Sequence, residues 1–175
     1  MQNDISLVIL CGGKGKRLGS ITKKIAKPLI KINQKPFIEY LINFYQGYKF
    51  DKIYLIGHYK SYQFKKIFHN KEFNFIKCEF IKEKKAMDTG GALNSIRKKV
   101  KGDMIVVNGD SYLNYDYLKF KNFNIINKSH SMILVKNLNY KSNNKLSRLK
   151  IEKKIIKKSY YSKYMNSGVY FFKKN

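Results

Sequence analysis

The sequence predicts one α/β domain in which helices cover both faces of a mostly parallel sheet. Apolar runs with the length of buried strands alternate with segments of helical period, and the first run ends at a cluster of glycines. The length of 175 residues suits one domain with a substantial core. Because the sequence shows neither an internal repeat nor a linker, we expect a single domain over residues 1–175.

The first half of the chain gives a regular alternation of strand and helix. The continuous apolar run at residues 5–11 predicts a strand buried on both faces. Pro36 suits the first turn of a helix, and apolar side chains follow it on one stripe. The stripe consists of Phe37, Leu41, Phe44 and Tyr48. Further strands are expected at 52–57, 75–81 and 104–107, and further helices at 61–68 and 91–100.

After Asp110 the pattern changes to successive strands. Strands are expected at 132–135, within 146–156 with a hairpin turn around 152–154, and at 168–172. Right-handed crossovers between the earlier strands produce a three-layer α/β/α Rossmann-like fold, here with a β-hairpin insertion. In such folds ligands bind beyond the carboxyl ends of the strands.

The formal net charge of +26 raises the question of a polyanionic partner. The charge comes mostly from lysine spread along the whole chain, whereas base-reading surfaces favour arginine. We interpret the charge as compositional drift and expect no specific nucleic-acid partner. The alternative, a nucleic-acid binder driven by charge alone, predicts affinity for random oligonucleotides that falls steeply with salt.

No apolar run approaches the roughly 20 residues needed to cross a bilayer, and the start of the chain does not read as a signal peptide. We therefore expect a cytoplasmic protein without a membrane partner. Cys11 and Cys78 lie in apolar segments and are expected to be buried free thiols. The histidines His58, His69 and His130 are scattered, so no catalytic triad is expected.

Directly after the first strand the sequence reads GGKGKRLG, at residues 12–19. Glycines at this place let backbone N–H groups approach a phosphate chain, and nearby cations supply counter-charge. The cations are Lys14, Lys16, Arg17 and Lys27. The loop lacks the GK[ST] ending of a Walker A motif, and no suitably placed acidic residue completes a dinucleotide-binding fingerprint.

The whole stretch resembles the opening signature of sugar-1-phosphate nucleotidyltransferases, in which GGxGxRL is followed by a spaced Lys-Pro pair, here Lys27-Pro28. Three further landmarks follow in family order. They are Glu83 with the DTGGAL run at 88–93, the VNGD run at 107–110 and the NSGVY run at 166–170. Within the family the sequence most resembles the D-glycero-D-manno-heptose 1-phosphate guanylyltransferase branch. The resemblance implies a GT-A-like form of the predicted fold and a role in nucleotide-sugar synthesis for surface polysaccharides.

The implied reaction joins a nucleoside monophosphate from an NTP to a sugar 1-phosphate and releases pyrophosphate. A phosphate monoester is already ionised at neutral pH, so the reaction needs charge stabilisation more than a general base. By resemblance, Arg17 steadies the leaving group, and Lys27 bridges the attacking phosphate and the α-phosphate. Asp110, expected at the end of a strand, is the candidate ligand for a Mg²⁺ cofactor; its alternative is a turn aspartate.

The remaining site residues follow from the same resemblance. The nucleotide-binding set is Leu10, Cys11, Gly12, Gly13, Lys14, Gly15, Lys16, Arg17, Glu83, Asp88, Thr89 and Gly90. The sugar-binding set is Asn108, Asn166 and Gly168. Guanine presents N–H donors that a carboxylate at Glu83 or Asp88 would accept, so GTP is the expected nucleotide; either carboxylate could instead cap a helix or face water. A cytidylyl-, uridylyl- or thymidylyltransferase and a non-catalytic nucleotide-binding remnant stay open.

The sequence departs from the family pattern at three places. Lys16 replaces the usual threonine of the loop, and Met87-Asp88 stands where the family has Leu-Gly. The expected Glu-Lys pair, Glu152-Lys153, falls in the hairpin turn instead of after the second hairpin strand.

Family members continue beyond the point that corresponds to Asn175 into a second metal-binding aspartate and often a dimer contact. We therefore expect weak or absent transferase activity from this polypeptide, and homo-oligomerisation stays open.

Overall fold

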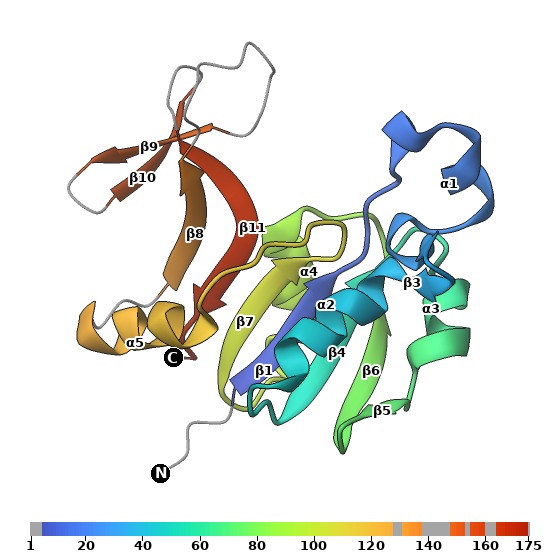
Figure 1. Cartoon of the computed structure of the whole chain (residues 1–175), viewed down its shortest axis with the longest axis horizontal. Coiled ribbons are helices and arrows are strands. Elements are labelled where there is room, and N and C mark those ends of the chain that lie inside the picture. The colour runs from blue at the N-terminus through green and yellow to red at the C-terminus, as the bar shows by residue number, and fades with distance from the viewer. Residues whose placement is uncertain (1–4, 128–130, 138–147, 153–154, 160–163, 175) are drawn as a thin grey trace.

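The computed structural model describes residues 5–127, 131–137, 148–152, 155–159 and 164–174. A nine-stranded sheet runs through this part of the chain, with helices on both of its faces (Figure 1). This is the three-layer α/β arrangement that the sequence predicts. Within the described ranges no helix has the length and apolar character needed to span a membrane.

The parallel part of the sheet is built around β1 (Ile5–Leu10). This strand lies between β4 (Lys52–Gly57) and β7 (Asp103–Asn108), and β6 (Ile76–Lys82) pairs with the far side of β4. A short edge strand, β5 (Glu72–Phe73), is antiparallel to β6. Because the four long strands are parallel, their carboxyl ends lie along one edge of the sheet, where such folds bind ligands.

The later strands are antiparallel. β11 (Tyr164–Phe172) pairs with β7 on one side and with β8 (Ser131–Asn137) and β9 (Arg148–Glu152) elsewhere along its length. β10 (Ile155–Ser159) pairs with β9, with Ile155 opposite Glu152, which confirms the predicted hairpin. Residues 153 and 154 of its turn, Lys153 among them, lie outside the described residues.

Helices cover the two faces because strand side chains alternate between them. Leu7 and Ile9 of β1 face the core shared with α2 (Phe37–Gln46), α3 (Ser61–Phe68) and α5 (Tyr117–Asn127). Val8 faces the opposite cluster beside α4 (Thr89–Ile96). The predicted stripe on α2 packs against the core, but the helix ends at Gln46, so Tyr48 lies beyond it. α4 begins two residues earlier and ends four residues earlier than the predicted segment.

Several elements that sequence periodicity does not predict complete the fold. They are the 3-10 turns η1 (Lys16–Leu18) and η2 (Lys27–Leu29), helix α1 (Ser20–Lys24), the small hairpin of β2 (Lys31–Ile32) and β3 (Lys35–Pro36), and α5. Apart from α5 these elements are too short to show a period. In α5 the apolar residues do not fall on one clear stripe, and it packs through Tyr117 and Phe120.

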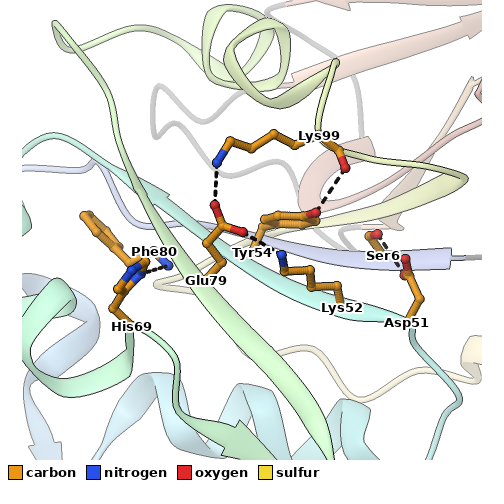
Figure 2. A network of polar contacts seen from close by, with 8 residues as sticks. All are labelled: Ser6, Asp51, Lys52, Tyr54, His69, Glu79, Phe80 and Lys99. Carbon is orange, nitrogen blue, oxygen red and sulfur yellow. Dashed lines mark hydrogen bonds and ion pairs between the residues drawn. The ribbon is translucent and has the colours of Figure 1, made fainter.

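Toward the amino ends of the parallel strands, polar side chains connect β4, β6 and the segment after α4 (Figure 2). Glu79 of β6 accepts a 2.6 Å ion pair from Lys52 of β4 and a second one from Lys99. The Tyr54 hydroxyl donates to the Lys99 carbonyl at 3.2 Å. Burial alone would raise the pKa of Glu79, but hydrogen bonds from the two lysines outweigh burial and lower it. This network therefore holds the charged Glu79 carboxylate between β4, β6 and the turn that follows α4.

Candidate active site

A cleft of about 390 Å³ opens at the carboxyl ends of the parallel strands, beside the start of α4. Its walls come from the ends of β1, β4 and β7, from the loop that leads into α4 and from the turn η2. The lining residues are Leu10, Cys11, Gly12, Gly13, Lys27, Pro28, Ile56, Glu83, Ala86, Met87, Asp88, Thr89, Ala92, Asn108 and Asp110. The cleft thus lies where the fold predicts a ligand site.

Two close backbone contacts shape the floor of the cleft. The Cys11 N–H donates to the Ile56 carbonyl at 2.6 Å, and the Gly109 N–H donates to the Leu10 carbonyl at 2.8 Å. A Cβ atom at Gly109 would lie only 2.8 Å from that same Leu10 oxygen. Glycine at 109 therefore lets the loop after β7 cross the end of β1, and this crossing carries Asp110 into the cleft.

Lys27 and Asp110 meet inside the cleft. The Lys27 Nζ lies 2.7 Å from Asp110 Oδ2, and the Ser111 hydroxyl donates to Asp110 Oδ1 at 3.1 Å. Lys27 begins η2 and is separated from Asp110 by 83 positions in the sequence. Both side chains keep partial exposure, so the cation and the carboxylate are each accessible to a ligand in the cleft. The structure therefore brings together two of the three predicted catalytic residues.

The glycine loop packs against both Thr22 and Lys27 at Gly15. Gly15 adopts a left-handed conformation with φ of 63°, and a Cβ there would lie 2.8 Å from Thr22 Cγ2 and 3.3 Å from Lys27 Cβ. The buried Thr22 hydroxyl lies 3.2 Å from the Gly15 carbonyl and 3.3 Å from the Gly19 carbonyl. Glycine is required at 15 because both the backbone angle and the space exclude a side chain.

Glu83 is a buried carboxylate at the back of the cleft. It is 3% exposed, and its Oε1 has no hydrogen-bond partner among the residues that the structure describes. Its Oε2 lies 3.1 Å from the position that a Cβ of Gly12 would occupy. Burial raises the pKa of Glu83, while the nearby His58 and a backbone hydrogen bond from Met87 lower it to a smaller extent. A ligand that donates hydrogen bonds here would satisfy a carboxylate that otherwise lacks a partner.

The loop into α4 adds Asp88 and Thr89 to the wall. Asp88 is at the N-cap position, but its side chain makes no capping hydrogen bond and is exposed at the cleft. Gly91 allows Met87 to pack closely, since a Cβ at 91 would lie 2.8 Å from Met87 Cβ. The alternative role for Asp88, capping of the helix, is therefore not realised in this structure.

The predicted sugar-binding residues lie together at the seam between β7 and β11. Gly168 has φ of 76°, and a Cβ there would lie 2.4 Å from Asn108 Nδ2. The Gly168 N–H donates to Asn166 Oδ1, and Asn166 Nδ2 donates to the Tyr170 hydroxyl, both at 2.8 Å. Among the predicted set, Asn108 lines the cleft, Gly168 packs against the Asn108 amide, and Asn166 accepts the hydrogen bond from Gly168.

The structure places other predicted residues outside the lining of the cleft. These are Lys14, Gly15, Lys16, Arg17, Gly90, Asn166 and Gly168. Lys14, Lys16 and Arg17 are exposed, and Arg17 forms no ion pair with any residue in the described ranges. The phosphate-binding role of these cations stays a prediction.

The two cysteines are buried free thiols, as expected. Burial raises the pKa of the Cys11 thiol well above its ordinary value and that of Cys78 to about 12. Both thiols are therefore neutral at physiological pH. Cys11 contributes to the floor of the cleft by packing and not by nucleophilic chemistry.

Sequence reasoning did not assign several lining residues to the site, namely Pro28, Ile56, Ala86, Met87 and Ala92. Pro28, Met87 and Ala92 lie in the motifs that it named. Ile56 gives no sequence signal, because it reads as an ordinary core residue of a strand.

Comparison with known proteins gives consistent matches. The family model described as nucleotidyl transferase matches residues 6–175. D-glycero-alpha-D-manno-heptose 1-phosphate guanylyltransferase of Campylobacter jejuni is 34% identical over 75% of this chain, which spans 58% of that relative. The crystal structure of HddC from Yersinia pseudotuberculosis complexed with GMP-PN is 30% identical with a TM-score of 0.75, over 97% of this chain and 76% of that one. A structure titled as a putative glucose-1-phosphate thymidylyltransferase from Bacillus anthracis has a TM-score of 0.83 and covers 97% of this chain and 72% of that chain. Because its sequence is only 19% identical, this match supports the fold alone.

Proposed function

This chain belongs to the nucleotidyl transferase family, and we propose that it joins the nucleoside monophosphate of an NTP, GTP in particular, to a sugar 1-phosphate with release of pyrophosphate. The observation that carries the proposal is the meeting of Lys27 and Asp110 at 2.7 Å in a cleft floored by Gly12 and Gly13. A cation, a carboxylate and exposed backbone together form a site that suits phosphoryl groups.

In the proposed reaction the protein orients the two phosphate groups and supplies positive charge beside them. A phosphate oxygen of the sugar 1-phosphate attacks the α-phosphorus, and the bond from that phosphorus to the bridging oxygen of pyrophosphate breaks. The attacking oxygen is already ionised at neutral pH because the second pKa of a phosphate monoester is about 6. Lys27 offsets the repulsion between the two anions. Its flexible stem allows it to turn from Asp110 to the phosphates.

We propose that Mg²⁺ binds at Asp110 together with the phosphates of the nucleotide. Across the described part of the chain no three His, Cys, Asp or Glu side chains gather at one place, so the protein would contribute few ligands. That suits Mg²⁺, which is held in such sites by one or two carboxylates plus substrate phosphates and water. Asp110 fits this role because its oxygens face the cleft and already accept hydrogen bonds from Lys27 and Ser111. When bound, the metal would supply positive charge to the triphosphate.

The choice of GTP rests on Glu83. Guanine carries N–H donors on adjacent positions of one edge, and Glu83 offers a buried carboxylate whose Oε1 lacks a partner among the described residues. Uracil and thymine have one such donor and flanking carbonyls, which an ionised carboxylate would repel. The names of the similar guanylyltransferase and of the HddC complex with GMP-PN support the same base.

A heptose 1-phosphate is the acceptor that we propose, on the strength of the Campylobacter jejuni relative. On this chain the acceptor would lie beside Asn108, whose amide is held in place by Gly168. We further propose that the product serves polysaccharide synthesis in the cytoplasm.

Release of pyrophosphate tests the proposal directly. The chain is incubated with Mg²⁺, heptose 1-phosphate or mannose 1-phosphate, and GTP, ATP, CTP, UTP or dTTP in separate reactions. We expect the highest rate with GTP and heptose 1-phosphate, and no rate above background for Asp110→Asn. A faster reaction with a pyrimidine triphosphate would reject the base assignment, and nucleotide binding without turnover in any pair would reject the enzyme.

A further inference from the structure

Helix α1 ends against the first turns of α3. It contains only five residues, so its last carbonyl groups have no partners within the helix. The Tyr59 hydroxyl donates to the Thr22 carbonyl at 2.8 Å, and Gln63 Nε2 donates to the Lys24 carbonyl at 2.9 Å. Two side chains from one neighbouring segment therefore complete the C-terminal end of α1.

The same glutamine also fixes the residue immediately before Lys27. Gln63 Oε1 accepts from the Ala26 N–H at 2.9 Å, and the Ala26 carbonyl accepts from the Leu29 N–H at 2.8 Å. Both polar groups of the Ala26 backbone are thus used, and Ala26 itself is buried. The direction in which the chain enters Lys27 is set by an amide on another helix.

The support for this amide is rigid. Gln63 lies on α3 directly before Phe64, and both Phe64 and Phe68 are completely buried in the main core. The half-buried Gln63 side chain is therefore attached to a part of α3 whose backbone is held by core packing.

Residues 22–26, which Tyr59 and Gln63 hold in place, contact the glycine loop at one end and lead into Lys27 at the other. At one end the Thr22 hydroxyl contacts the carbonyls of Gly15 and Gly19 in the glycine loop. At the other end Lys27 extends to Asp110 at 2.7 Å. A shift of the segment would therefore move the loop and the lysine together.

We propose that Gln63, assisted by Tyr59, is a positioning residue for the transfer reaction. It touches no reacting atom and acts by holding residues 22–26, which set the place of Lys27 and of the glycine loop. The inference rests on the proposed function as far as catalysis is concerned, whereas the clamp itself is a property of the fold.

Amide hydrogen exchange tests the clamp without any substrate. In Gln63→Leu the Ala26 N–H loses its acceptor, and we expect its exchange to accelerate by about tenfold or more, with smaller increases at neighbouring amides. Gln46→Leu is the matched control, because Gln46 is a half-buried helical glutamine without a side-chain hydrogen bond in the described structure. Equal exchange at Ala26 in Gln63→Leu and the unchanged protein would overturn the clamp.

A double-mutant cycle tests whether the clamp acts through Lys27. We expect Gln63→Leu to lower kcat/KM by about tenfold at a temperature well below the melting transition of the variant, since a displacement on the order of 1 Å has effects of this size or larger. In a Lys27→Ala background the same change should cost less than about twofold. Gln63→Glu, which keeps the acceptor for Ala26 but not the donor to Lys24, should recover part of the activity. Equal losses in both backgrounds would overturn action through Lys27.

The two experiments separate the inference from the proposed function. If the unchanged protein releases no pyrophosphate with any substrate pair, the proposed function fails, and the clamp is still decided by exchange at Ala26. If the protein is active and the clamp is present but the cycle is additive, the proposed function stands and the positioning of Lys27 by Gln63 fails.

Discussion

The two ends of the parallel strands carry the same chemical pair, a lysine against a carboxylate, in opposite settings. Toward the amino ends Glu79 forms ion pairs with Lys52 of the neighbouring strand β4 and with Lys99 of the turn after α4 (Figure 2). At the carboxyl ends Asp110 forms an ion pair with Lys27, and both residues line the cleft. Neither residue lies in a strand or an α-helix.

The difference lies in what else can reach the carboxylate. Among the described residues Glu79 pairs with two cations, so its charge is already balanced and an external ligand adds little. In the same part of the chain Asp110 pairs with a single lysine that has a flexible stem, and an open cleft lies beside it, so a metal ion or a phosphate can exchange with that lysine. The amino ends hold the sheet and helix together, and the carboxyl ends leave charge available for chemistry.

Removal of one lysine from each end tests whether the two ends differ in function. Lys27→Ala should lower kcat by about 10²–10³, because a preorganised cation at a developing charge has effects of that size. Lys52→Ala, the matched lysine at the other end, should change kcat by less than about twofold. Steady-state pyrophosphate release measures both, and similar losses for the two variants would remove the distinction between the ends.

A second test concerns Glu83, the other carboxylate in the cleft. Its pKa is raised by burial, although His58 opposes this, and it must be ionised to accept two N–H groups from guanine. The ionised fraction grows as the pH rises through the raised pKa, so GTP affinity should increase with pH over that interval. Glu83→Gln should weaken GTP by about tenfold at neutral pH and flatten the pH dependence.

Titration calorimetry with GTP and Mg²⁺ over a range of pH makes this measurement. Cys11, which is neutral at these pH values, is not expected to contribute to the slope. A slope that persists in Glu83→Gln would assign the titration to another group and count against base recognition by Glu83.

The smallest effect is expected at Glu79. Its pKa is lowered in the folded protein, so it stabilises the fold above the ordinary carboxyl pKa, and this contribution is lost as the pH falls through the lowered value. Glu79→Gln should reduce the free energy of unfolding by about 1 kcal/mol or less at neutral pH, as for other partly exposed ion pairs. Urea unfolding at neutral and acidic pH should show the difference between the two proteins shrinking in acid, with turnover unaffected.

Much of the fold follows from local signals in the sequence. The apolar run before Gly12 gives β1, and the glycine loop with Lys27-Pro28 predicts which end of the sheet carries the cleft. Asp110 is predictable as a site residue because it follows a short apolar strand, and the carboxyl ends of parallel strands lie at the same edge of a sheet. These features depend on residues close together in sequence.

What could not be predicted depends on residues far apart. Nothing near Gln63 in the sequence shows that its amide contacts Lys24 and Ala26, more than 35 positions away. The burial of Glu83 depends on the packing of Gly12 and the loop into α4, and a carboxylate among lysines reads as solvated. Arg17 shows the opposite case, since the motif implies a role and the structure places it outside the lining of the cleft.

The pairing of β7 with β11 separates the parallel strands from the antiparallel strands, and the sequences of these two parts can change independently. Among the described strands, β11 alone joins β8 and β9 to the parallel ones, and it meets β7 beside Asn108. Insertions or exchanges in the antiparallel strands would therefore reshape the proposed acceptor side, while the crossing of Gly109 over β1 stays intact. Under the proposed function, one scaffold would acquire new acceptors over evolutionary time without rebuilding the half of the cleft proposed to hold the nucleotide.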